Sequence, residues 1–215
     1  MRNVQNDTTG ISRREFLKEA GFLLGGAALA PVPLAAACTP NQVPLPNTTV
    51  TTTVTVNLPP GNVAPSDVVT LHINRQEYRL AVRPGWTLDF VLRERLGLFG
   101  TKIGCERGDC GSCTILADGV PVLACLMLAI ECGGLIIETI ESASQGITLS
   151  PLQRRFCERE AFQCGFCTPG FIMAAQGLLN VNPHPTVGEV REALAGHICT
   201  CGNLSRVVQA VTGGL

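Results

Sequence analysis

The chain has 215 residues, of which 46% are hydrophobic, 15% charged and 5% aromatic, and its formal net charge is −1. This composition is typical of a globular protein and excludes disordered and collagen-like classes. A near-neutral charge argues against broad binding to nucleic-acid phosphates, which needs a basic surface, so we expect no nucleic-acid partner. The unusual feature is the presence of 11 cysteines, whose spacing must distinguish disulfides from metal-bound thiolates.

Residues 1–37 are predicted to be an export signal. Ser12–Lys18 reads S-R-R-E-F-L-K and matches the twin-arginine motif at every specified position. The apolar run Ala20–Ala30 is short for a membrane span, and Ala35–Ala37 offers an A-x-A cleavage site. The segment therefore favours twin-arginine export to the periplasm over a membrane anchor.

Residues 38–66 connect this signal to the remainder of the chain and are dominated by Pro, Thr, Val and Asn. We interpret them as an exposed, extended linker, with an edge strand at Val50–Val56 as the alternative. Cys38 follows the cleavage site directly, so a lipid anchor at Cys38 is a second outcome of processing. The lipobox is imperfect, because Ala35 stands where Leu is preferred.

Residues 67–142 are predicted to form an α+β domain. A helix with apolar residues on one face should begin after Thr87 and end at Gly97. Asp118-Gly119 is a strong signal for a two-residue hairpin turn. The pattern predicts strands at Val68–Ile73, Glu77–Val82, Cys113–Ala117, Val120–Cys125 and Ile136–Ile140.

Residues 143–215 are predicted to form a helical domain. Ser150 with Gln153, and Thr186 with Glu189, are spaced as capping boxes at helix starts. Pro169 suits the first turn of a further helix. The predicted helices begin at Pro151, run over Pro169–Asn180, extend from Val187 towards a stop at Gly196, and run over Leu204–Val211.

The first cysteine quartet has the spacing C-x4-C-x2-C followed by a more distant cysteine, which is typical of a plant-type [2Fe–2S] site. Disulfides and structural zinc are the alternatives, but three cysteines so close together make a poor framework of cross-links, and zinc sites normally use two paired motifs. We expect Gly104, Gly108 and Gly111 to adopt positive φ and let the loop approach the cluster. The predicted ligands are Cys105, Cys110, Cys113 and Cys125.

The second quartet, C-x2-C followed by C-x-C, is less specific, and by itself it fits zinc as well as iron–sulfur. Its members are Cys164, Cys167, Cys199 and Cys201. We expect the remaining Cys132 and Cys157 to be small buried apolar residues. His72 and His184 are expected to be structural or surface residues, while His197 lies near a ligand pair and is a candidate to hydrogen-bond a sulfur.

Five motifs occur in one order along the chain and together resemble a known family. They are Gly100–Thr114, Ala124–Leu126, Thr139–Glu141, Gln163–Gly170 and Gly196–Gly202. The chain is similar to the [2Fe–2S] small subunit of the molybdenum hydroxylases, the xanthine dehydrogenase and aldehyde oxidoreductase family. Among these it looks most like the iron–sulfur subunits of exported bacterial aldehyde oxidoreductases.

This resemblance implies an α+β fold: a plant-ferredoxin-like β-grasp domain followed by an all-α four-helix bundle, each holding one [2Fe–2S] cluster. It assigns the second quartet to a cluster next to the molybdopterin, expected as the cytosine dinucleotide, of a large partner subunit. Gln163 would hydrogen-bond that pterin, and Cys201 would lie beside it. Electrons from oxidative hydroxylation of an aldehyde or an N-heterocycle would then pass to an FAD-binding subunit or to an external acceptor such as a cytochrome.

Two positions depart from the family pattern. Thr200 stands where Arg is common, and Leu204 stands where an aromatic residue is frequent. The cluster ligands are intact, so these departures bear on the contacts to the pterin or the partner chain and on the cluster potential. Two other functions stay open: a free-standing exported ferredoxin-like carrier, and a disulfide- or zinc-stabilised binding module.

Overall fold

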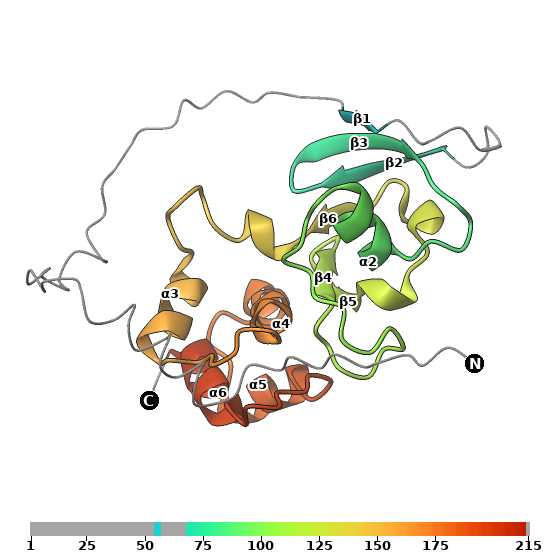
Figure 1. Cartoon of the computed structure of the whole chain (residues 1–215). Coiled ribbons are helices and arrows are strands. Elements are labelled where there is room, and N and C mark those ends of the chain that lie inside the picture. Colours follow the sequence, from blue (N-terminus) through green and yellow to red (C-terminus); the bar gives the residue numbers. More distant parts are fainter. Residues whose placement is uncertain (1–53, 57–67, 214–215) are drawn as a thin grey trace, which may run out of the picture. The chain divides into compact units, whose positions relative to one another are not determined.

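The computed structural model describes residues 54–56 and 68–213 (Figure 1). The predicted export signal and the Cys38 site lie outside these residues. The N-terminal half contains a six-stranded mixed sheet in the order β1-β3-β2-β6-β4-β5. The pairs β1/β3 and β2/β6 are parallel, and the other pairs are antiparallel. Its strands are β1 (Val54–Val56), β2 (Val68–Ile73), β3 (Gln76–Ala81), β4 (Thr114–Ala117), β5 (Val120–Leu123) and β6 (Ile136–Glu138).

Two tight turns fix the antiparallel hairpins. Asn74 and Arg75 between β2 and β3 have φ values of 52° and 67°, and Asp118 and Gly119 between β4 and β5 have 50° and 79°. Positive φ at both central residues is what a two-residue hairpin turn with right-handed strand twist requires. The hairpin predicted at Asp118-Gly119 is therefore confirmed, and β2 and β3 form a second one, with strand ends shifted by up to two residues from the predicted ones.

Three predictions in this half need correction. Residues Val54–Val56 were interpreted as part of an extended linker, with an edge strand as the alternative. They pair with β3 as a parallel edge strand, so the alternative is correct at these residues. The strand predicted to reach Cys125 ends at Leu123, because Ala124–Leu126 turns into a short 3₁₀ segment, η3. The strand predicted over Ile136–Ile140 ends at Glu138.

The helix predicted after Thr87 begins as α2 (Leu88–Phe90) and continues as a wider π-type turn, η2 (Val91–Arg95). The widening appears in the bond from Leu96 N to Val91 O, which is 3.1 Å long. Gly97 has φ 70° and ends the helix, as predicted. The helix covers a core of fully buried side chains that includes Leu71, Ile73, Leu88, Leu92, Ile115 and Ile137.

The C-terminal half consists of helices around a second core. Both predicted capping boxes are present: Ser150 and Gln153 exchange bonds of 2.8 and 3.2 Å, and Thr186 and Glu189 exchange bonds of 2.7 and 3.3 Å. The helix expected to continue to Gly196 ends at Ala193, and tighter turns follow it. The helices are α3 (Pro151–Glu158), α4 (Thr168–Val181), α5 (Val187–Ala193) and α6 (Leu204–Thr212).

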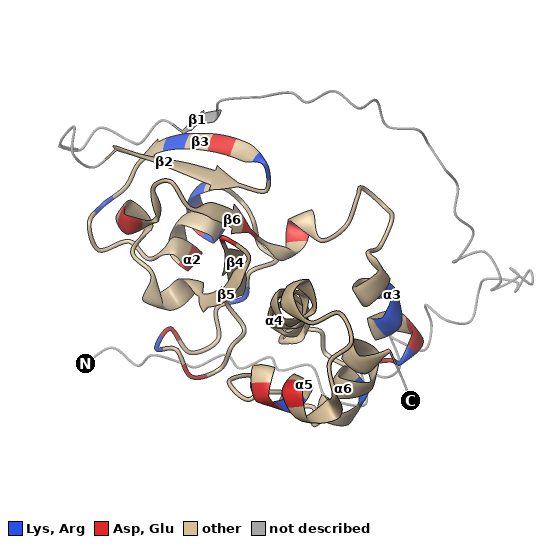
Figure 2. Cartoon of the chain, turned by 180° about the vertical axis from the view of Figure 1, so that it is seen from behind, with Lys and Arg blue, Asp and Glu red and all other residues tan. Residues whose placement is uncertain are grey.

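Helix α4 lies against both cores. It carries no Lys, Arg, Asp or Glu, in contrast to α3 and α5 (Figure 2). A Cβ atom on Gly177 would lie 2.2 Å from Pro121 Cγ, so this glycine lets α4 approach the β4–β5 hairpin closely. The two halves belong to one compact unit. Among the helices of residues 68–213, none has the length and apolar character needed to cross a bilayer.

Candidate metal centres

The first quartet gathers around one loop. Cys105, Cys110 and Cys113 lie in residues 100–113, which we call the first cysteine loop, and Cys125 lies in η3 on the other side of the β4–β5 hairpin. The loop turns its backbone N–H groups inward, and the N–H of Asp109 donates to Cys105 Sγ at 3.3 Å. Inward N–H donors are the groups that a cluster with several thiolates and sulfides needs.

Glycines shape this loop in two ways. Gly108 and Gly111 have φ values of 87° and 72°, as predicted, and Glu106 also has a positive φ of 54°, which the sequence analysis missed. Gly104 does not adopt positive φ, so that prediction is wrong. Its role is spatial, because a Cβ there would lie 2.8 Å from Cys110 Sγ.

The thiols of the first quartet interact in two pairs. The backbone N–H of Arg107 lowers the pKa of Cys105 to about 7, and the neighbouring Cys110 thiol adds to this effect. Burial raises the pKa of Cys113 to about 12, and this thiol lies beside Cys125. A buried thiol of this kind becomes a thiolate at neutral pH only when a nearby cation such as a bound metal stabilises it.

The second quartet repeats this arrangement between the helices. Cys164 and Cys167 precede α4, while Cys199 and Cys201 lie in residues 195–203 between α5 and α6, which we call the C-terminal cysteine loop. The N–H of Phe166 and the Cys201 thiol lower the pKa of Cys164. Burial raises the pKa of Cys167 to about 12, with Cys199 as its neighbour.

Each quartet contributes the four thiols that a [2Fe–2S] cluster needs as ligands. A [2Fe–2S] cluster takes two protein ligands on each of its two irons, which two pairs of thiols can supply. None of the ten cysteines in this part of the chain forms a disulfide.

Gln163 lies next to the second quartet. It is exposed, and its Nε2 donates to the carbonyl of Cys201 at 3.4 Å. The structure therefore brings together the two residues that the sequence analysis assigned to the pterin. The exposed side chains of Phe162 and Phe166 flank Gln163 in the sequence, and Leu204 is also exposed.

The first and C-terminal cysteine loops are in direct contact. The N–H of Ile198 donates to the carbonyl of Cys110 at 3.0 Å. Gly170 packs so closely that a Cβ on it would lie 2.3 Å from the carbonyl oxygen of Gly111. Ile198, one position before Cys199, thus bonds directly to the backbone of Cys110.

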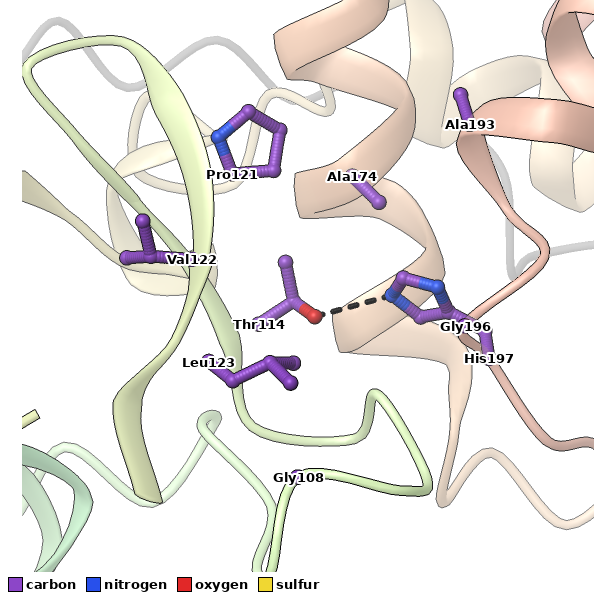
Figure 3. A pocket seen from close by; sticks show the side chains of 9 residues that line it. All are labelled: Gly108, Thr114, Pro121, Val122, Leu123, Ala174, Ala193, Gly196 and His197. Atoms are coloured by element: carbon purple, nitrogen blue, oxygen red, sulfur yellow. Dashed lines mark hydrogen bonds between the residues drawn. The ribbon is translucent and has the colours of Figure 1, made fainter. Parts of the chain in front are cut away.

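His197 also takes part in this contact. The sequence had suggested that it hydrogen-bonds a sulfur, but its partner is an oxygen. Its Nε2 lies 3.0 Å from Thr114 Oγ1, and its ring centroid is 5.1 Å from that of Phe171. His197 and Thr114 line a small pocket of about 210 Å³ (Figure 3). The bond between Thr114 and His197 was not predicted, because nothing in the sequence around Thr114 indicates a partner 83 positions away.

The other cysteines and histidines stand apart from the quartets. Cys132 is buried, as expected, and its thiol donates to the carbonyl of Leu128 at 3.2 Å. Cys157 is exposed on α3, so the prediction that it is buried is wrong. His72 and His184 are exposed.

Two family models match the chain. Residues 71–129 match the 2Fe–2S iron–sulfur cluster binding domain, and residues 137–212 match the [2Fe–2S] binding domain. The first match contains the first quartet, and the second match contains the second quartet.

Several known proteins are similar over nearly their whole length. The nicotine 6-hydroxylase small subunit of Paenarthrobacter nicotinovorans is 47% identical over 150 residues, which are 69% of this chain and 90% of the relative. The aldehyde oxidoreductase iron–sulfur-binding subunit PaoA of Escherichia coli O157:H7 is 34% identical over 216 residues, which are 94% of this chain and 86% of the relative. In the crystal structure of quinoline 2-oxidoreductase from Pseudomonas putida 86, one chain matches with a TM-score of 0.66 and 46% identity, covering 67% of this chain and 90% of that one.

Proposed function

Because this chain belongs to the family of small iron–sulfur subunits of molybdenum hydroxylases, we propose that it holds two [2Fe–2S] clusters and connects a molybdopterin site in a partner subunit to an electron acceptor. The observation that carries the proposal is the pairing of eight thiols into two quartets, each within one cluster-binding domain match. When bound, the clusters supply one-electron carriers for the two electrons that each hydroxylation releases.

We assign one cluster to Cys105, Cys110, Cys113 and Cys125, and the other to Cys164, Cys167, Cys199 and Cys201. The protein stabilises the negative charge of each cluster with inward N–H groups, such as the one of Asp109 at 3.3 Å from Cys105 Sγ. It buries one pair of thiols in the first quartet and leaves the other pair nearer to solvent. Donated hydrogen bonds and burial are the means by which a protein tunes the reduction potential of such a cluster.

Gln163 and Cys201 form the edge that faces the pterin in this proposal. The amide of Gln163 already reaches the Cys201 carbonyl, so a small rotation would allow its second N–H to serve a pterin oxygen or nitrogen. The exposed side chains of Phe162, Phe166 and Leu204 supply apolar surface for the large subunit beside that edge. Thr200, which is exposed, contributes no positive charge where an arginine would.

The substrate site belongs to the large subunit, whose cofactor we propose to be the cytosine-dinucleotide form of molybdopterin. An aldehyde or an N-heterocycle is the substrate class, in keeping with the names of the relatives. Electrons then leave from the first cluster to an FAD-binding subunit or to a cytochrome.

We also propose the finer architecture and location given by the family resemblance. The mixed sheet with α2 would be a β-grasp domain over residues 67–142, and helices α3–α6 would be a four-helix bundle within residues 143–215. Residues 1–37 would direct twin-arginine export to the periplasm, with Cys38 as a lipidation site in one outcome. The match to PaoA covers 94% of this chain and thus reaches into residues 1–37.

The alternatives make different predictions. A free-standing carrier would function without a large subunit, whereas we expect the surface around Gln163 to be covered by one. A zinc-stabilised module would contain a single zinc ion at each quartet and no iron or sulfide.

The test is to co-express the chain with its large subunit and to measure iron and acid-labile sulfide in the purified complex. About four irons and four sulfides per small subunit are expected from two [2Fe–2S] clusters. Cys105→Ser and Cys164→Ser should each remove about half of the iron, while Cys157→Ser, outside both quartets, should remove none. Zinc in place of iron, or full iron content in both quartet variants, would contradict the proposal.

A further inference from the structure

A hydrogen bond between two side chains that carry no sulfur joins the two halves beside the cysteine quartets. Thr114, directly after Cys113, places its Oγ1 3.0 Å from His197 Nε2, although the two residues are 83 positions apart in sequence. In Figure 3 the imidazole of His197 points toward the Thr114 hydroxyl, and a dashed line marks the bond between them. Thr114 is 4% exposed, so this bond is shielded from bulk water.

Counting donors defines the direction of this bond. The hydroxyl of Thr114 has one proton, which it donates to the carbonyl of Gly111 at 2.7 Å. It therefore accepts from His197, whose proton is assigned to Nε2. The other ring nitrogen, Nδ1, is buried without a hydrogen-bond partner among the described residues. Two hydrogen bonds in series therefore connect His197 through Thr114 to the backbone of the first cysteine loop.

The same ring also fills the space that Gly111 leaves open. A Cβ on Gly111 would lie 2.5 Å from His197 Cδ2, so the imidazole rests on the backbone of the first cysteine loop. The adjacent residue, Ile198, donates its N–H to the Cys110 carbonyl at 3.0 Å. The side-chain bond of His197 and the backbone bond of Ile198 thus connect the C-terminal cysteine loop to the first one at two neighbouring positions.

We propose that His197 and Thr114 are positioning residues that set the separation and orientation of the two clusters. The inference rests on the proposed function, because it requires a cluster in each quartet. Both residues act through backbone groups of the cysteine loops: Thr114 holds the Gly111 carbonyl, and His197 fixes the segment that leads to Cys199. Because magnetic coupling and electron transfer between clusters depend on their spacing and orientation, loosening this tether should change both while each cluster stays bound.

The test compares Thr114→Val, which removes the hydroxyl at nearly constant volume, with Thr114→Ser, which keeps it. Both are studied in the purified complex with its large subunit. Thr114→Val should alter the magnetic splitting between the two fully reduced clusters in electron paramagnetic resonance, with about two spins per chain retained. It should also speed amide exchange at Ile198 by about fivefold, the effect of losing one ordinary hydrogen bond. Thr114→Ser should restore both readouts.

His197→Leu removes the same bond from the other half and gives the same test if Thr114→Val does not retain both clusters. The double variant should change the splitting no more than the single ones, because both remove one interaction. Unchanged splitting and unchanged exchange in Thr114→Val and His197→Leu would overturn the tether and leave the proposed function intact. Fewer than two clusters in the unmodified chain would instead contradict the proposed function itself.

Discussion

Gly111→Ala should destabilise the contact between the two cysteine loops, and its cost can be derived from two separate effects. Gly111 has φ 72°, and a left-handed conformation costs an alanine about 1–2 kcal/mol. Its new Cβ would also lie 2.6 Å from His197 Cγ and 2.8 Å from the backbone oxygen of Gly196. Overpacking of this kind costs a further 1–3 kcal/mol or so, because a backbone atom cannot move aside as a flexible side chain can.

Gly119→Ala is the matched control. Gly119 has φ 79°, but a Cβ there meets nothing within 4 Å, so only the conformational cost remains. The difference of about 1–3 kcal/mol corresponds to a melting temperature about 3–10 °C lower for Gly111→Ala than for Gly119→Ala in a chain of this size. Thermal unfolding of the loaded protein at one fixed heating rate measures this difference. Equal melting temperatures for the two variants would refute the close packing of the two loops.

Three further predictions concern the helical half. Gly170→Ala should lower the free energy of unfolding by about 1–3 kcal/mol, because its Cβ would lie 2.3 Å from the carbonyl oxygen of Gly111 in the first cysteine loop. Gly188→Ala, whose Cβ would meet Thr186 Oγ1 at an ordinary contact distance of 3.9 Å, should be neutral or stabilising in chemical denaturation. Ser150→Ala should cost about 1 kcal/mol in the same assay through loss of the cap of α3, and no change would contradict the capping box. The N–H and hydroxyl of Thr186 lower the pKa of Glu189. The charged carboxylate therefore stabilises the folded chain at pH values above the usual carboxyl pKa, and this stabilisation is lost as the pH falls through the lowered pKa. The stability difference between the unmodified chain and Glu189→Gln should therefore shrink between pH 7 and about pH 3, and a constant difference would contradict this.

Local signals in the sequence were sufficient for much of the fold. The Asp118-Gly119 turn and the capping box at Ser150 depend on residues within a few positions of each other, and both are present. The cysteine quartets could be recognised for the same reason, because ligand spacing within one loop is a local property. The parallel pairing of Val54–Val56 with β3 could not be decided, because an isolated alternating segment does not specify which strand edge it joins.

The features that were missed depend on how residues pack in the folded chain. Gly104 was expected to provide positive φ, but its neighbour in space, Cys110 Sγ, explains the need for glycine. The partner of His197 turned out to be a threonine from the other half rather than a sulfur. Cys157 was expected to be buried from residue type alone, yet its place on α3 faces solvent. Of these three features, only the bond of His197 to Thr114 requires both halves to be folded together.

The most direct test of the central claim is low-temperature electron paramagnetic resonance of the dithionite-reduced complex, with spins counted against small subunit. Two distinct S = 1/2 signals, amounting to about two spins per chain, are the expected result for two inequivalent [2Fe–2S] clusters. A single signal that disappears in Cys105→Ser and persists in Cys164→Ser would show that the helical quartet holds no cluster. Absence of any signal from a protein with intact quartets would contradict the electron-transfer function.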